Sequence, residues 1–348
     1  MNKKQITQFG RFRKDLYKGD ALYVGTAEFI LEMLLKKTTA FARSCEIEPV
    51  VFEKEGRRSA QALWIKAKDD DFAQVAFFDC ERGEKEAANQ IVDDCVRLTK
   101  ERGLRRLVIG LNGHLSYGVG LLTQTDLKNS FDTCYNKMYY SDFFRDIPDK
   151  KYLTAYRCPL SEASERMDKS GIQTDGYNVR TANFKKFEAE CEIMRRLCDE
   201  TIGQTYLYSP TRKGHFFDLL KDMKIILKEE NLLFLMYEGR EVGFLFWHPD
   251  FNCTLKAGKA ISALNLACGA VFGRKKIDTV KLNSIGVEDE HRGRGTLALL
   301  RALRERAGGK YKFIETNFVW DENRRSRLLN LRLLYGECRK FEVYEVRI

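Results

Sequence analysis

Two periods of apolar residues alternate along the chain, and together they predict a mixed α/β protein. In residues 25–44 and 84–102 the apolar positions recur at the spacing of one helix face. In residues 59–67 and 71–80 they form short runs on either side of an acidic turn, which predicts two paired strands. Further strands are predicted at 104–112 and 150–160.

The polar segment 161–178 separates this part of the chain from a second part with a similar order of elements. Helices are predicted there at 185–202, 211–228, 296–307 and 323–334, a strand hairpin at 232–251, and single strands at 278–287, 311–320 and 340–348. The repeated order suggests a duplicated fold, with one domain at 1–160 and another at 175–348. The apolar run 260–272 is too short to span a membrane and is expected to be a buried helix or a packed loop.

The stretch 286–300, GVEDEHRGRGTLALL, contains the most informative motif. A predicted strand ends at Val287, and a short acidic turn leads through Arg292-Gly-Arg-Gly295 into a helix. The first N–H groups of a helix have no partner within it and carry partial positive charge, and glycine lets a ligand approach the backbone closely. A pyrophosphate fits such a site, and the arginines would add charge-assisted bonds. A charged loop with a glycine turn is the alternative interpretation.

This arrangement resembles the acyl-CoA pyrophosphate loop of the GNAT N-acetyltransferase superfamily. Arg292 and Gly295 match the family pattern Arg/Gln-x-x-Gly-x-Gly/Ala, and Leu297 stands where the family has a small residue. The segment 317–329, with Asn323 at the start of a helix, and the hairpin around Gly239 resemble the neighbouring elements of that family. The resemblance covers residues 178–348 and implies a mixed sheet flanked by helices.

The first part of the chain resembles the N-terminal domain of tandem GNAT-like bacterial proteins, which lacks the phosphate loop. Residues 79–84 are acidic and contain a single glycine. We therefore expect the first domain to bind no CoA, and to be structural or to complete the substrate cleft.

The resemblance implies an acyl-CoA-dependent N-acyltransferase, with acetyl-CoA as the favoured co-substrate and a primary amine as acceptor. The backbone of Ile285 and Val287 would pair with the pantetheine arm, on a strand that splays from its neighbour. The expected cofactor-binding residues are Ile285, Val287, Arg292, Gly293, Arg294, Gly295, Thr296 and Asn323. The acceptor, a small molecule or a peptide amine, is not specified by the sequence.

Glu315 and His248 are the candidates for the catalytic base. Glu315 lies mid-strand in an apolar stretch, where burial would raise the pKa of a carboxyl group. A structural carboxylate paired with an arginine is the alternative. His248 ends a hairpin strand, and Asp250 after it either joins the site or caps a turn. The family often has a tyrosine acid where this chain has Asn330. An acceptor bound as the free amine would need no base.

Charge and cysteine spacing add few constraints. The net charge is +10, and residues 291–340 contain thirteen basic and five acidic residues, which suits an anionic ligand. The ten cysteines include no Cys-x-x-Cys pair, so no metal is expected. The first residues form no apolar run, which predicts no signal peptide, a cytoplasmic protein and no membrane association.

Two other functions fit the same residues. Leu297 and Asn330 suit a protein that binds acyl-CoA without turning it over. The basic segment suits an aminoacyl transferase that uses charged tRNA, since paired GNAT-like domains also occur there. The phosphate motif argues against that second alternative, because those enzymes dispense with CoA. Nucleic acid is therefore less favoured than an amine acceptor.

Overall fold

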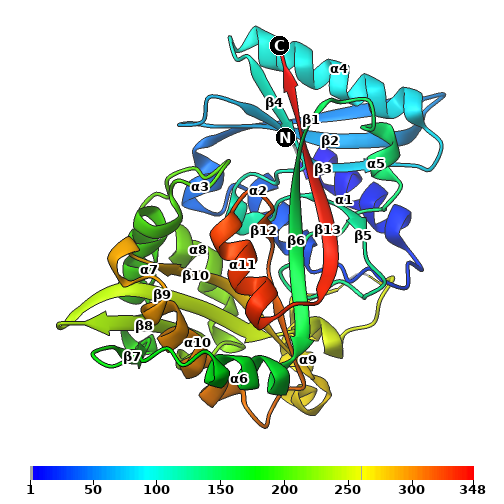
Figure 1. Ribbon diagram of the computed structural model, residues 1–348. Coiled ribbons are helices and arrows are strands. Elements are labelled where there is room, and N and C mark those ends of the chain that lie inside the picture. The colour runs from blue at the N-terminus through cyan, green and yellow to red at the C-terminus, as the bar shows by residue number, and fades with distance from the viewer. Residues whose placement is uncertain (1–2, 260) are drawn as a thin grey trace.

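The computed structural model describes residues 3–259 and 261–348, and within them one large mixed sheet runs through the whole molecule (Figure 1). Residue 260, the first of the apolar run 260–272, lies outside the described residues. The strands are β1 (Cys45–Lys54), β2 (Arg57–Ala67), β3 (Ala73–Cys80), β4 (Arg106–Ile109), β5 (Leu121–Gln124), β6 (Asp149–Pro159), β7 (Asn178–Thr181), β8 (Leu232–Tyr237), β9 (Arg240–Pro249), β10 (Thr279–Val287), β11 (Phe313–Thr316), β12 (Val319–Trp320) and β13 (Glu337–Arg347).

Helices pack on both faces of this sheet, in keeping with the predicted α/β class. The α-helices are α1 (Lys3–Tyr17), α2 (Ala27–Leu35), α3 (Ala40–Arg43), α4 (Lys85–Glu101), α5 (Tyr140–Phe143), α6 (Leu160–Lys169), α7 (Phe187–Ile202), α8 (His215–Leu220), α9 (Ala263–Phe272), α10 (Arg294–Ala307) and α11 (Arg324–Leu333). The 3-10 turns are η1 (Leu115–Tyr117), η2 (Phe184–Lys186), η3 (Asp222–Ile225), η4 (Glu229–Asn231), η5 (Phe251–Thr254), η6 (Arg274–Lys276) and η7 (Asp289–His291). Within the described residues, no helix combines the length and the apolar character that a membrane crossing requires.

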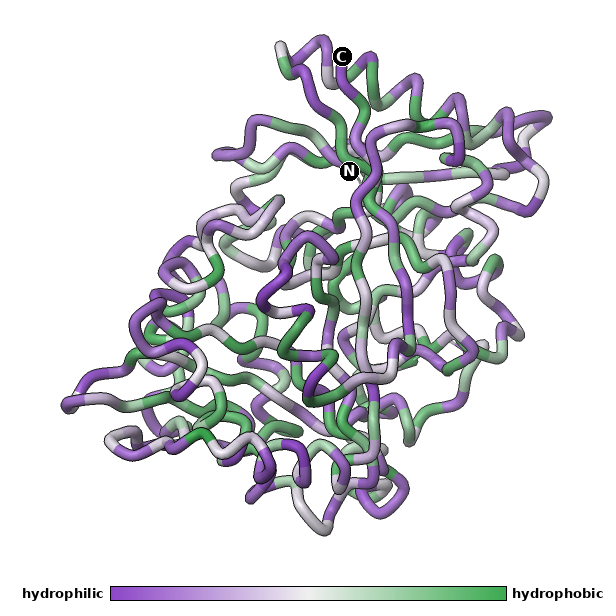
Figure 2. The backbone as a smooth tube through the Cα atoms, in the orientation of Figure 1, coloured by the Kyte–Doolittle hydropathy of each residue, from purple (hydrophilic) through white to green (hydrophobic). Residues whose placement is uncertain are grey.

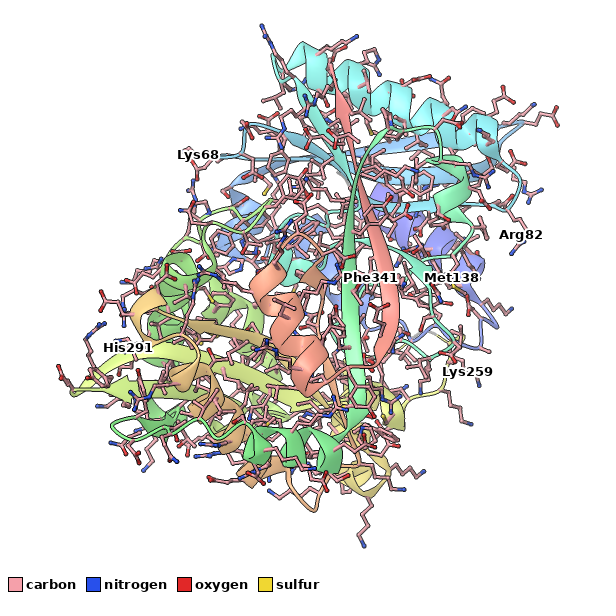
Figure 3. The ribbon with its side chains drawn as sticks, viewed as in Figure 1. Lys68, Arg82, Met138, Lys259, His291 and Phe341 are labelled. Carbon is pink, nitrogen blue, oxygen red and sulfur yellow. The ribbon has the colours of Figure 1, made fainter. Side chains whose placement is uncertain are left out.

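The two halves of the chain exchange their last strands. The sheet order is β1-β2-β3-β4-β13-β6-β11-β10-β9-β8-β7. The C-terminal strand β13 therefore pairs with β4 of the first half, while the end of β6 pairs with β11 of the second half. Figure 1 shows β6 and β13 side by side along the length of the molecule, and Figure 3 labels Phe341 on β13 near the middle of that pair. The predicted domain limits stay a prediction, because this sheet is continuous across them.

Each half contains the same β-α-β unit. Strands β3 and β4 are parallel and joined through α4, and β10 and β11 are parallel and joined through α10. Each unit is preceded by an antiparallel partner strand, β2 in the first half and β9 in the second. The similar order of elements predicted from the sequence therefore corresponds to a repeated arrangement in space.

Two apolar clusters enclose the sheet of the second half. Along β9, Leu245 and Trp247 pack into the cluster that holds α6 and α10. Phe244 and Phe246 pack into the opposite cluster, which holds α7, α8 and α9. Burial on both faces explains why this strand reads as a continuous apolar run rather than an alternating one. Figure 2 shows the same contrast between hydrophobic strands and polar connecting loops.

The local predictions fail in places where the chain bends. The predicted helix 25–44 is interrupted before α3, where Thr39 caps the new helix by accepting a hydrogen bond from the backbone N–H of Ala42 (3.1 Å). The predicted strand 311–320 divides into β11 and β12. Helices α1 and α6 were not predicted, because their apolar positions are sparse. Strand β1 was not predicted either, and Pro49 lies in its middle. The apolar run 260–272 forms the helix α9 from Ala263 onwards.

We expect the two halves to unfold together, because each supplies a strand to the sheet of the other. Trp64 lies on β2 and Trp247 on β9, so a variant in which one of them is the single tryptophan, with Trp320 also replaced, reports on one half. Urea denaturation followed by tryptophan fluorescence should give the same midpoint for both variants, equal to the midpoint from circular dichroism of each. Two separated transitions within one variant would contradict this expectation.

Candidate active site

Strands β10 and β11 stay paired over only part of their length. The pairing extends as far as Leu282 and Thr316, and the backbone N–H of Asn317 then donates to the carbonyl of Leu282 (2.9 Å). A bulge follows in β10 at Asn283, and β10 continues along β9 to Val287. Beyond this point β12 pairs with β6 instead. Among the described strands, the edge of β10 after Leu282 therefore has no second partner, and the two strands diverge as the resemblance implied.

The turn after β10 places an open helix start beside this edge. Gly293 caps α10 with a φ of 82°, which a side chain rarely adopts, and no atom lies within 4 Å of where its Cβ would be. The backbone at this position is thus open to a ligand. Figure 3 labels His291, which precedes the turn and lies far from the β6–β13 pair. Its Nδ1 is hydrogen-bonded to the hydroxyl of Tyr177 (3.1 Å).

Both arginines of the motif connect the turn to neighbouring segments through hydrogen bonds to backbone carbonyls. Arg292 donates from Nε to the carbonyl of Val287 and from Nη2 to that of Thr201, each at 3.2 Å. Arg294 donates to the carbonyls of Gln173 (3.1 Å) and Asp175 (3.0 Å). A guanidinium has five N–H groups, so each arginine keeps donors for an anion. Their proposed contact with a phosphate stays a prediction.

The next three residues fit the first turn of α10. A Cβ on Gly295 would lie 2.5 Å from Cδ2 of Leu235, so glycine lets the helix start pack closely on β8. Thr296 is half-buried. Leu297, where the family has a small residue, is buried in the cluster between α10 and the sheet. Its larger side chain therefore serves the packing of the helix on the sheet.

The remaining predicted binding residues lie on two different elements. Ile285 and Val287 lie on the divergent part of β10, opposite Leu245 and Gly243 of β9. Asn323 caps α11, where its side chain accepts a hydrogen bond from the backbone N–H of Ser326 (3.1 Å). The structure thus gathers 285–296 around one strand end and turn, and gives Asn323 a structural role in its own helix.

Glu315 lies at the centre of a buried ion cluster that joins the two halves. Its side chain is 1% exposed, and its Oε1 accepts from Nζ of Lys281 (3.0 Å) and Nε of Arg339 (3.2 Å). The hydroxyl of Ser130 donates to the same oxygen (2.7 Å), and Lys281 also donates to Thr133 (3.0 Å). The cluster therefore combines β10, β11 and β13 with a loop of the first half.

The two cations hold the pKa of Glu315 at about 2, although burial by itself would raise it. A carboxylate with so low a pKa is a weak base. The geometry therefore matches the structural alternative that the sequence left open, rather than the catalytic one. The sequence did not reveal Lys281 as a partner.

His248 lies across β10 from Glu315, with Lys281 between them. It is fully buried, its Nδ1 is bonded to the carbonyl of Pro249 (3.0 Å), and burial lowers its pKa to about 4. Asp250 caps η5, accepting from the backbone N–H groups of Asn252 (3.1 Å) and Phe131 (2.7 Å). This is the turn-capping alternative. Neither Glu315 nor His248 lines the cavity described next.

A cavity of about 700 Å³ lies on the α7–α8–α9 face of the sheet. It extends from the bulge of β10, where Asn283 forms part of its wall, to α2 of the first half. Both halves therefore enclose it, as expected if the first half completes a substrate cleft. Its walls are mainly apolar, with Phe131, Met194 and Phe246 among the buried side chains.

Asp132 is a carboxylate of this cavity that the sequence did not single out. It lies on the loop between β5 and α5, and its Oδ2 accepts a hydrogen bond from the side chain of Asn283. Protein surrounds the carboxylate on the sides that do not face the cavity, and this desolvation raises its pKa to about 7. No local motif marks this residue. Only the tertiary structure brings it to the bulge of β10.

No protein-family model matches this sequence, and no curated protein is significantly similar to it. Solved structures do match. A tandem GNAT protein from the clavulanic acid biosynthesis pathway superposes over 99% of this chain and 96% of its own, at 12% identity and a TM-score of 0.56. The fold is that of the tandem GNAT proteins.

Two further structures superpose over 99% of this chain. One is a glucosamine N-acetyltransferase region of a fungal multi-domain β-N-acetylglucosaminidase, with 11% identity, a TM-score of 0.56 and 37% of that chain covered. The other is a conserved protein of unknown function from Enterococcus faecalis, with 9% identity, a TM-score of 0.54 and 70% covered. The fold class predicted from the sequence is confirmed.

The two GNAT-like units differ at the start of their crossover helices. In the second unit the turn contains Arg292 and Arg294. In the first unit, Glu84 caps α4 and Glu81 forms an ion pair with Arg57 (2.7 Å). The turn of the second unit has two arginines after its acidic residues, whereas the turn of the first unit has the single Arg82, so the second turn suits an anionic ligand better.

Replacing Glu315 by glutamine should destabilise the protein by about 3–5 kcal/mol, because it leaves two buried cations without a countercharge. The matched control is Glu337→Gln on β13, whose partner Lys340 is half exposed (50%), and it should change stability by less than about 1 kcal/mol. Urea denaturation measures both.

The difference in stability between the wild type and Glu315→Gln should depend on pH. The contribution of Glu315 is complete above its ordinary pKa of 4.5 and is lost as pH falls toward about 2. The difference between wild type and Glu315→Gln should therefore narrow below pH 4.5. If Glu315→Gln instead lost enzymatic activity at unchanged stability, the structural assignment would be wrong.

Proposed function

We propose that this protein is an acyl-CoA-dependent N-acyltransferase that transfers an acyl group, with acetyl favoured, to a primary amine. The observation that carries the proposal is the divergence of β10 from β11 next to the open start of α10. An extended amide-rich arm can pair with a free strand edge, and a pyrophosphate suits a helix start. The tandem GNAT fold is consistent with this function.

Residues of the divergent segment fit a bound acyl-CoA. The edge of β10 from Asn283 to Val287 would pair with the pantetheine arm. Ser284 has a buried hydroxyl without a hydrogen-bond partner among the described residues, and a polar arm would supply one. The first N–H groups of α10, at Gly295 and Thr296, would hold the pyrophosphate together with Gly293.

The cavity on the opposite face provides room for the acceptor. It reaches β10 at Asn283, where the two strands part. An amine in the cavity and a thioester between the strands would then meet at the bulge. A backbone N–H directed at the thioester carbonyl would stabilise the negative charge that develops there. The protein supplies position and polarisation, and the co-substrate supplies the activated acyl group.

A second function, acyl-CoA binding without transfer, is favoured by one observation. Tyr335, near the position where the family often has a tyrosine acid, is 40% exposed and bonded to Glu162 (2.5 Å). Tyr344 is buried and bonded to Glu342. The two tyrosines that follow α11 in the sequence are thus bonded to glutamates elsewhere. Release of CoA in the presence of amines distinguishes the transferase from the binding protein.

Acetyl-CoA should raise the melting temperature of the wild-type protein, and Thr296→Glu should abolish this increase. A carboxylate in the first turn favours the helix by about 0.3–1 kcal/mol but repels a pyrophosphate. The variant should therefore remain as stable as wild type without ligand. Thr296→Gln, similar in size but neutral, is the control and should retain most of the increase. Absence of any increase in the wild type at saturating acetyl-CoA would refute the proposal.

A further inference from the structure

Apart from one carboxylate, the inner part of the cavity is apolar or internally bonded. Its polar wall residues Thr26, Ser116 and Thr133 all have partners: Thr26 accepts from Asn252 (3.3 Å), and Thr133 from Lys281 (3.0 Å). The hydroxyl of Ser116 is bonded to two histidine rings, at 2.8 and 2.9 Å. The apolar lining includes Phe29, Met33, Phe131, Met194, Phe216 and Phe246.

The other carboxylates of the wall lie near its outer part and are either neutralised or in solvent. Glu32 forms an ion pair with Lys36 one turn along α2. Asp218 accepts from the backbone N–H of Ala40 (2.8 Å) and pairs with Lys221 (3.2 Å). Asp222 is exposed. These groups therefore provide no enclosed negative charge.

Within the part of the chain that the structure describes, Asp132 differs from these carboxylates because it is neither paired with a cation nor exposed at the outer part of the cavity. Among the described residues, no cation lies within ion-pair distance of it, and its Oδ1 has no hydrogen-bond partner. Its single bond, from Asn283, ties it to the bulge where β10 leaves β11. The carboxylate thus stands where an acceptor in the cavity would reach the divergent strands.

The loop that carries Asp132 is fixed on both sides of it. Ser130 is bonded to Glu315 (2.7 Å), and the backbone N–H of Phe131 donates to Asp250 (2.7 Å). Thr133 accepts from Lys281 (3.0 Å). Asp132 itself has a φ of 59°, a conformation that is uncommon for residues with a side chain and is tolerated best by Asn and Asp. The position of the carboxylate is therefore preorganised rather than adaptable.

From this arrangement we propose that Asp132 binds the ammonium group of the acceptor and removes its proton, and that the acceptor is a primary amine on an apolar chain or ring. The inference rests on the proposed acyl transfer. In this step the proton of R–NH3+ passes to the Asp132 carboxylate, and the nitrogen attacks the thioester carbon. The C–N bond forms, the C–S bond breaks, and a second proton passes from the nitrogen to the CoA thiolate, so that the product amide keeps one N–H. The protonated Asp132 then returns its proton to solvent.

The size and lining of the cavity define the rest of the acceptor. A cavity of about 700 Å³ suits a ligand larger than a simple alkylamine head group, and its surface offers mainly dispersion and hydrophobic contact. A polyamine or an amino acid would place a second charge against this apolar wall, which costs free energy. We therefore expect selection for a single positive charge and an extended apolar part.

Several charged groups influence the protonation of Asp132. Burial disfavours the carboxylate, whereas Lys281 of the ion cluster and the hydrogen bond from Asn283 favour it. The charged residues on the cavity wall are Glu32 and Lys36 of α2, Asp218 of α8, Lys221 after α8 and Asp222 of η3. The balance sets the pKa of Asp132 at about 7, so the free carboxylate becomes available as pH rises through that value.

The binding test uses octylamine, with spermidine as the polar comparison and with no co-substrate present. Octylamine should raise the melting temperature of the wild type more than spermidine does, and Asp132→Asn should lose this response. Asparagine tolerates the same backbone conformation and can accept the bond from Asn283, so the variant should keep its fold. Asp126→Asn, an exposed change on the same loop, is the control and should behave as wild type. An equal increase in melting temperature with both amines would overturn the role of Asp132 in recognising the amine. An increase with octylamine that persists in Asp132→Asn would overturn it as well.

The kinetic test uses acetyl-CoA and octylamine, following CoA release against pH. The wild-type kcat should rise as pH passes through about 7. Asp132→Asn should lower kcat by about 100-fold or more and remove this inflection, which a structural role would not do. A rise in KM with unchanged kcat and unchanged pH profile would overturn the base role. Transfer only to polar amines would overturn the acceptor class.

Failure of the proposed function gives a different pattern. A wild-type protein whose melting temperature does not respond to acetyl-CoA refutes acyl transfer itself, whatever octylamine does. A protein that binds acetyl-CoA and acetylates spermidine but not octylamine keeps the proposed function and loses this inference.

Discussion

The structure depends on one buried carboxylate that serves two cations. Glu315 on β11 accepts bonds from Lys281 on β10 and Arg339 on β13, and all three side chains are at most 2% exposed. Charges without water are tolerated only when they are paired and hydrogen-bonded. The strands that supply them must therefore come close together: β10 pairs with β11, and β13 lies on the other side of β6. Because Ser130 and Thr133 of the first half bond to Glu315 and Lys281, the complete cluster exists only when both halves have folded onto each other.

The same cluster determines the form of the candidate site. It lies at the last paired residues of β10 and β11, so it holds these strands together just before they diverge. It also fixes the loop of the first half through Ser130 and Thr133, and thereby places Asp132 between them at the bulge. An ion cluster with no direct part in the chemistry thus positions both the free strand edge and the carboxylate of the cavity. A loss of Glu315 would disturb function through structure.

In the proposed reaction, the co-substrate and the acceptor bind on opposite faces of the sheet. The start of α10, where Gly293 leaves the backbone open, suits an anionic co-substrate. The cavity under α7, α8 and α9 suits an apolar acceptor. The first half has Glu84 at the N-cap of its crossover helix, where an acidic residue disfavours an anion. It contributes α2 and the Asp132 loop to the cavity instead. In the proposed reaction the two similar halves therefore differ in function: the second binds the co-substrate, and the first completes the acceptor cavity.

The sequence by itself determined the features that depend on neighbouring residues. Apolar periodicity predicted the hairpin β8–β9, the strand β10 and the helix α10, and the arginine–glycine turn indicated the open helix start, because these are properties of a few consecutive positions. The surroundings of Glu315 and Asp132 were decided by the tertiary structure. Asp132 meets Asn283 across 151 residues of chain, and Glu315 meets Lys281 across 34. A local pattern contains no information about such partners, and the pKa of a buried carboxyl group depends on which charges the fold places beside it.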